Sequence, residues 1–302
     1  MVTGTSVRIR HVALCPEVAP LLCAVEDIPE HWHDQHIAWF RLDPTLNIGL
    51  GAGWQASVAL PIDLRSIVVD YETADGAPFD PPYADIHHRT ETLAGPTDGT
   101  LFARKYLHAG DHAIVGLGLG TSLPIGATEE DPYALTEQGL THQHMQLGSG
   151  TFVPTASVDG MLLGARWGAT AWVSGRLPLY ANTKGYRPGA SVTGGVGPSW
   201  RPIPPLQLLG TLEGSFEGPE SWRGTPYGSR ATVVGGLTGA YSLSDALVLQ
   251  AQARVTAFTW SGHHDADEGS AVQRFLGTVG VSWSFDLRPD PTDPESGGIL
   301  SE

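Results

Sequence analysis

The sequence predicts an all-β protein: a single antiparallel transmembrane β-barrel of about twelve strands, of the outer-membrane type. Three observations predict it, namely period-2 alternation of apolar and polar residues, connections that alternate between short and long, and aromatic residues gathered near one end of the strands. The chain has 302 residues, of which only 16% are charged while 41% are hydrophobic. A low charge at ordinary hydrophobicity fits a barrel whose outer surface faces lipid.

The alternation is clearest in the second half of the chain. In residues 247–256, Leu247, Leu249 and Ala251 fall on one face, and Gln250 and Gln252 fall on the other. Such alternation over ten or more residues is typical of a strand with one apolar and one polar face. The pattern predicts strands at 6–15, 36–48, 54–72, 98–108, 112–124, 148–161, 165–180, 187–201, 205–217, 228–242, 246–260 and 272–286.

The connections between these predicted strands alternate in length. Those at 49–53, 109–111, 162–164, 202–204 and 243–245 are short, whereas most of the others are long, such as 16–35, 73–97 and 125–147. Short turns at one end and long loops at the other are typical of outer-membrane barrels. A soluble β-sandwich also alternates, but it has no reason to segregate its loops by length.

Aromatic residues on the predicted outward face cluster near the short-turn end, as expected for a girdle at one membrane interface. The predicted girdle consists of Trp54, Trp167, Trp200, Tyr241, Trp283 and Phe285. The core of a soluble, secreted all-β binding protein would hold the same residues, and this remains the alternative fold.

The barrel is predicted to form one domain, residues 1–286, followed by a C-terminal tail, residues 287–302, that is expected to be disordered because it is rich in Pro, Asp and Ser. Residues 1–25 lack the pattern of a signal peptide, so we expect a leader to be missing or removed. Two cysteines, Cys15 and Cys23, are too few for a disulfide framework, although they could close one small loop.

Composition and motifs exclude several functions. A net charge of −15 argues against nucleic acid as a partner. No apolar run approaches the roughly 18 residues of a membrane-spanning helix. The nucleophile-elbow, phosphate-loop and zinc-protease motifs are absent from the sequence, so we expect no enzyme. The expected partners are a lipid bilayer, lipopolysaccharide bridged to acidic loops by divalent ions, and a small-molecule solute. The oligomeric state is not predicted.

Residues 95–154 carry a family resemblance. Gly95-Pro96-Thr97-Asp98-Gly99 opens a strand, residues 116–126 read GLGLGTSLPIG, and residues 146–154 read QLGSGTFVP. This pattern resembles the outer-membrane barrel transporters of the meta-pathway of phenol degradation. Ile125 stands where that family usually has Thr, and Pro96-Thr97 interrupts the usual Gly-Asp step. The resemblance implies a pore or uptake channel for small, often apolar molecules.

Charged residues on the predicted inward face would line the lumen. Opposite charges there are expected to pair, because an unpaired charge is costly where water is scarce. A functional lining would select a polar or anionic solute. The predicted lining residues are Arg41, Asp43, Asp63, Arg65, Arg166, Arg176, Glu213, Arg230, Arg254 and Arg274.

Histidines are concentrated at the long-loop end, where nine of the twelve lie. Imidazole is the commonest metal ligand, and a His-x-His pattern beside a thioether suits copper or zinc. The candidate ligands are His31, His33, His142, His144 and Met145. Solvated or structural loop histidines are the alternative interpretation, since no spacing here matches a zinc signature.

The sequence therefore predicts an outer-membrane channel that works by passive or facilitated diffusion. The width and the charge lining of its lumen would set its selectivity. A surface barrel that captures copper or zinc at its loop end is the second hypothesis. A soluble all-β binding protein is the third.

Overall fold

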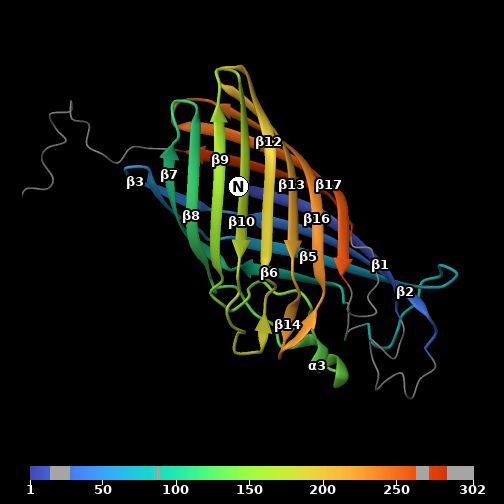
Figure 1. Ribbon diagram of the computed structural model, residues 1–302. Helices are drawn as coiled ribbons and strands as arrows, with labels where there is room; N and C mark the ends of the chain where they lie inside the picture. The colour runs from blue at the N-terminus through green and yellow to red at the C-terminus, as the bar shows by residue number, and fades with distance from the viewer. Residues whose placement is uncertain (14–27, 85, 87–88, 263–271, 284–302) are drawn as a thin grey trace, which may run out of the picture.

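A computed structural model describes residues 1–13, 28–84, 86, 89–262 and 272–283 of the chain. Its β-strands form the wall of a barrel, with short turns at the top of the view and long connections at the bottom (Figure 1). No helix in the described part of the chain is long and apolar enough to cross a membrane.

One antiparallel sheet of fifteen strands makes up this wall. In chain order its strands are β1 (Val2–Ala13), β2 (His31–Leu42), β3 (Thr45–Gly51), β4 (Trp54–Ala59), β5 (Ile62–Thr73), β6 (Glu91–Pro96), β7 (Gly99–His108), β8 (Ala113–Leu123), β9 (Pro154–Leu163), β10 (Trp167–Arg176), β12 (Ser191–Ile203), β13 (Leu206–Glu217), β16 (Ser229–Ser242), β17 (Leu247–Gly262) and β18 (Val272–Trp283).

The sheet closes on itself through its first and last strands. β1 pairs with β18, for example Val2 with Val279, and on its other side β1 pairs with β2. Three long strands are each broken into two pieces, β2 with β3, β4 with β5, and β6 with β7, and both pieces of each keep the same neighbouring strand. The fifteen pieces therefore trace twelve barrel strands, and the alternative of a soluble sandwich is wrong.

The three breaks lie at one height of the wall, and a proline lies in or directly before each. Pro44 separates β2 from β3, Pro61 separates β4 from β5, and Pro96 ends β6. Proline has no N–H and a fixed φ, so it interrupts a strand in the middle of a sheet. The single strands predicted at 36–48 and 54–72 are wrong for this reason. Backbone hydrogen bonds from Leu60 N to the Pro44 carbonyl (3.1 Å) and from Thr97 N to the Pro61 carbonyl (2.9 Å) still join the broken strands.

Strands on one side of the barrel extend beyond the predicted boundaries. β2 begins at His31, inside the predicted connection 16–35, and β6 lies inside the predicted connection 73–97. Polar residues conceal these extensions in the sequence, because a strand beyond the lipid no longer needs an apolar outer face. Figure 1 shows β1, β2 and β5 crossing behind the front wall formed by β8 to β16.

The long connections contain short elements that the sequence did not predict. A one-and-a-half-turn helix, α3 (Pro132–Glu137), is capped by Asp131, whose carboxylate accepts from the N–H groups of Tyr133 and Ala134. A second sheet joins β11 (Tyr186–Arg187), β14 (Glu220–Trp222) and β15 (Thr225–Tyr227). Both lie at the long-connection end (Figure 1).

The outer face of the barrel exposes large apolar side chains along its whole height, such as Leu212 and Leu237 on adjacent strands. Five residues of the predicted girdle are exposed, namely Trp54, Trp167, Trp200, Tyr241 and Trp283. Trp167 and Trp200 face each other across β10 and β12 with their rings stacked at 5.6 Å. Phe285 and the predicted tail 287–302 lie outside the described residues.

A charge on this outer face should destabilise the protein in a bilayer. We expect Leu212→Arg to lower the free energy of unfolding by about 2–4 kcal/mol, the cost of arginine facing lipid near the midplane. Thr211→Arg, one residue away on the opposite face, is the matched control and should cost much less. Urea unfolding in phospholipid vesicles measures both, and equal costs would contradict the assignment of the two faces.

Candidate functional site

The interior face of β2 and β5 carries a ladder of charged and aromatic residues. Arg41 lies opposite Asp63, and Trp39 lies opposite Arg65. The residues between them on β2 and β5, such as Phe40 and Leu64, are exposed on the outside. The same alternation that gives the barrel its lipid-facing surface therefore places two guanidinium groups and one carboxylate on the inner surface.

Asp63 is the centre of this cluster. Its buried carboxylate accepts hydrogen bonds from Arg41 Nε (2.6 Å) and Nη2 (3.1 Å) and from Arg65 Nε (3.1 Å) and Nη2 (2.7 Å). Both guanidinium groups lie over Trp39, 5.2 Å and 4.4 Å from its ring centroid. The side chain of Arg65 is 10% exposed, whereas that of Arg41 is 32% exposed. Arg41 is thus the member that a solute could reach.

The connection between β8 and β9, residues 124–153, is fastened to the wall at this height. The carboxylate of Asp98 accepts from Gly126 N (3.2 Å), Ser149 N (2.7 Å) and Ser149 Oγ (2.5 Å). Arg65 Nη1 donates to the Gln146 carbonyl (3.0 Å). Because Arg65 belongs to the interior ladder, this contact places the connection against the inner side of the barrel.

The glycine pattern of residues 116–126 is explained by close packing. A Cβ on Gly118 or Gly120 would lie 2.3 or 2.2 Å from the ring of Phe102, and a Cβ on Gly126 would lie 2.6 Å from the Gly148 Cα. The glycines of β8 therefore make room for an aromatic ring on β7, and Gly126 allows the connection to fold back on itself.

Other charged residues of the interior also pair across the strands. Arg254 donates to Glu213, and Arg104 lies 3.4 Å from Asp159. Trp172 lies over Gly195, where a Cβ would be 2.5 Å from its ring. Sequence reasoning missed Trp39, Arg104, Asp159 and Trp172, although their strand parity places them on the inner face.

The remaining predicted lining residues lie elsewhere. Arg230 pairs with Glu217 at 3.1 Å where β13 and β16 meet the long connections, and both side chains are largely exposed. Asp43 lies at the first strand break, Arg166 is exposed in the turn after β9, and Arg176 is exposed at the end of β10. Arg274 is on β18, but its side chain lies outside the description.

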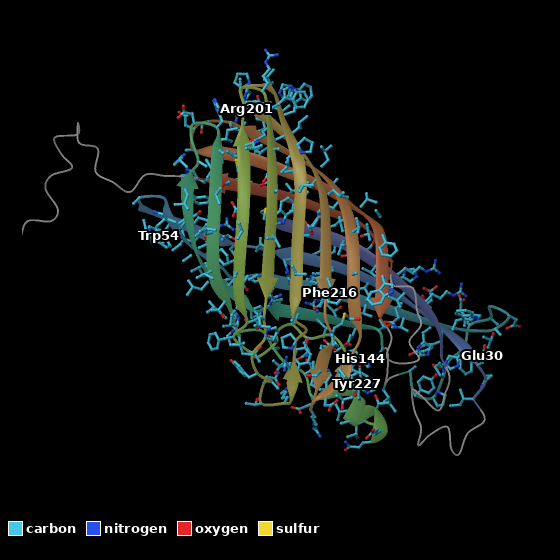
Figure 2. The ribbon with its side chains drawn as sticks, viewed as in Figure 1. Glu30, Trp54, His144, Arg201, Phe216 and Tyr227 are labelled. Carbon is cyan, nitrogen blue, oxygen red and sulfur yellow. The ribbon has the colours of Figure 1, made fainter. Side chains whose placement is uncertain are left out.

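The predicted metal ligands fall into two pairs. His31 and His33 lie on β2 with ring centroids 5.2 Å apart, and His142 and His144 lie in the connection 124–153 with centroids 5.1 Å apart. Glu30, next to the first pair, and His144 are well separated in Figure 2. Among the described residues, no three His, Cys, Asp or Glu side chains are placed to hold one metal ion. Met145 lies beside the second pair, and its N–H donates to the Gln143 side chain (2.8 Å).

The second pair serves the fold of the connection. His142 uses both ring nitrogens, Nε2 with Thr136 Oγ1 (3.0 Å) and Nδ1 with the Leu140 carbonyl (2.9 Å). His144 packs edge-on against Tyr133, which stacks on Tyr227 at 3.7 Å. Burial lowers the pKa of His142, and burial together with the neighbouring His142 lowers the pKa of His144 to about 4.

Comparison with known proteins gives a fold but no family. No family model matches the sequence, and no curated protein matches it. Among solved structures, the COG4313 outer membrane channel from Pseudomonas putida F1 is similar over 93% of both chains, with a TM-score of 0.56 and 13% identity. The NanC porin and a Pseudomonas aeruginosa FadL homologue give TM-scores of 0.45 and 0.40 at 8% and 10% identity, over 93% and 94% of this chain and 100% and 90% of theirs.

The first of these likenesses supports the fold of an outer-membrane β-barrel, and the two weaker ones add nothing to that conclusion. The closed wall and its exposed apolar surface agree with it. A closed barrel with an apolar outer surface is the architecture with which β-sheet proteins span an outer membrane.

Acid should loosen the connection 124–153. His144 is neutral in the folded protein, so its contribution to stability is complete above pH 6.5 and is lost as the pH falls towards about 4. Between these values we expect the equilibrium constant for opening of residues 138–146 to increase by up to about tenfold for each unit by which the pH falls. Hydrogen exchange of this segment across that pH range is the measurement.

His144→Gln should remove most of this pH dependence, with a small remainder due to His142. His108→Gln, at the short-turn end of β7, should leave it unchanged. Protection that does not vary with pH in the unmodified protein would contradict the assignment of a neutral, buried imidazole.

Proposed function

We propose that the protein is an outer-membrane channel through which a small molecule crosses by passive or facilitated diffusion. The observation that carries this proposal is the closed barrel whose outside is apolar and whose inside carries paired charges. A polar, hydrated interior is what a diffusing solute requires, whereas a barrel used only as an anchor could be filled with apolar side chains. The resemblance of residues 95–154 to channels of the meta-pathway type supports the same role.

We further propose that the solute is a small aromatic molecule bearing a negative charge. The inner surface combines aromatic rings with guanidinium groups: Arg41 and Arg65 over Trp39, and Arg104 5.3 Å from the Phe102 ring centroid. Guanidinium groups bind carboxylates and also stack on aromatic faces. Arg41 and Arg65 both donate to Asp63, and Arg41 also interacts with Asp43. These carboxylates compete with an anionic solute, which would keep its binding weak enough for release.

Single-channel recording in planar bilayers tests both proposals. In potassium chloride the refolded protein should give discrete conductance steps, and millimolar benzoate should reduce the open-channel current by occupying the lumen. Cyclohexanecarboxylate, of similar size and equal charge, should reduce it several-fold less because it cannot stack on the rings. Arg41→Ala should weaken the effect of benzoate several-fold.

Arg201→Ala is the matched control, because Arg201 is exposed near the short turn after β12 (Figure 2) and should not affect the current. Absence of conductance steps from protein shown to be inserted would overturn the channel. Conductance steps that benzoate and cyclohexanecarboxylate reduce equally would overturn only the proposal of an aromatic solute.

A further inference from the structure

The first histidine pair forms a buried cluster with a tyrosine from the connection 74–90. His31, His33 and Tyr83 are each fully buried. His31 Nε2 lies 3.3 Å from His33 Nε2, and the Tyr83 hydroxyl oxygen contacts the same His31 Nε2. Three atoms able to donate a lone pair therefore face one small region. Tyr83 lies at least fifty residues along the chain from both histidines, so the convergence is not a local accident of the strand.

Hydrogen bonding alone accounts poorly for this arrangement. His31 Nδ1 lies 2.7 Å from the Pro29 carbonyl, which only accepts, so Nδ1 carries a proton. In neutral His31 the atom Nε2 then has one lone pair, which His33 and Tyr83 would both have to use. The hydrophobic side chains packed against Tyr71 and Tyr83 are Ile28, Val69, Phe79, Ala84 and Ile86.

We propose that His31 Nε2, His33 Nε2 and the Tyr83 oxygen bind one divalent transition-metal ion, with zinc as the ion that fits best. In tetrahedral zinc sites the Zn–N bonds of 2.0–2.1 Å place ligand atoms about 3.3 Å apart, which matches the two imidazole nitrogens. The hydrogen bond from Nδ1 of His31 to a backbone carbonyl is the usual way in which a ligating imidazole is oriented. Three protein ligands leave a fourth position for water.

The position of the site indicates a structural role that goes beyond the channel proposed above. His33 pairs with Tyr71, and the cluster continues the interior ladder of β2 and β5 six to eight residues beyond Trp39, towards the long connections. Bound metal would fix Tyr83, and with it the connection 74–90, to β2. That connection also contacts the neighbouring one, because His142 N donates to the Ile86 carbonyl (3.3 Å). The ion would therefore stabilise the outer mouth of the barrel and would not pass through it.

Zinc titration of the full-length protein in detergent tests this site. After removal of bound metal with a chelator, Zn²⁺ is added in competition with a chromophoric chelator. We expect one tightly bound Zn²⁺ per chain and a higher melting temperature in its presence. Co²⁺ in place of Zn²⁺ should give the visible absorption of a four-coordinate ion. His33→Gln and Tyr83→Phe should each weaken binding at least tenfold and remove the stabilisation; Tyr83→Phe keeps the buried ring and so preserves the packing.

Two variants serve as controls for the other histidines. His142→Gln alters the second pair, and His36→Gln alters an exposed side chain on the opposite face of β2, so both should bind Zn²⁺ within twofold of the unmodified protein. Absence of stoichiometric binding, retention of binding in both His33→Gln and Tyr83→Phe, or equal loss in His142→Gln would each overturn the proposal. None of these outcomes bears on the conductance, so the channel and the metal site stand or fall separately.

Discussion

The need to pair every backbone N–H and C=O group within lipid is the constraint on which the rest of this structure depends. A sheet in a bilayer has no water to satisfy an edge, so it must close. Closure is achieved where β1 meets β18, with Val2 opposite Val279 and Gly4 opposite Gly277. Once the ring is closed, strand alternation separates the side chains into an apolar outer set and a polar inner set.

The proline breaks turn this uniform wall into a shaped interior. Pro44, Pro61 and Pro96 interrupt three neighbouring strands at one height, and the ladder of Trp39, Arg41, Asp63 and Arg65 lies directly beside the breaks. β8 and β9 reach only to this height, since Leu123 pairs with Gly99 just past the third break. The connection 124–153 occupies the space that longer strands would have filled, and Asp98 holds it there. The strand breaks, the charged ladder and the inward-folded connection therefore lie together at one height of the barrel.

The sequence predicted what depends on local periodicity. The opposite faces of Leu212 and Glu213 follow from alternation alone, as do the short turns at one end of the barrel. The breaks are also encoded locally, because Pro44 and Pro61 lie inside the predicted strands 36–48 and 54–72. The extension of β2 to His31 was not visible, because Asp34, Gln35 and His36 are polar where apolar residues would mark a membrane strand.

Contacts between distant segments were beyond the reach of the sequence. The pattern His31-Trp32-His33 marked a possible ligand pair, yet nothing in the sequence connects it with Tyr83, which lies in a predicted loop. Likewise, His142 and His144 have the same spacing as the first pair, but Thr136, Leu140 and Tyr133 engage them in the fold of their own connection. Spacing identifies candidate ligands, whereas only the tertiary structure shows which nitrogen atoms face one another.

The most direct test of a water-filled, closed barrel compares two adjacent positions at its seam. Thr278 faces Thr3 on the inner side, and Val279 is 63% exposed on the outer side. In a background with Cys15→Ser and Cys23→Ser, Thr278→Cys and Val279→Cys are exposed to a charged, water-soluble thiol reagent during single-channel recording. In a closed, water-filled barrel the first variant reacts and loses current, while the second does not react. Reaction at Val279→Cys with none at Thr278→Cys would contradict such a barrel.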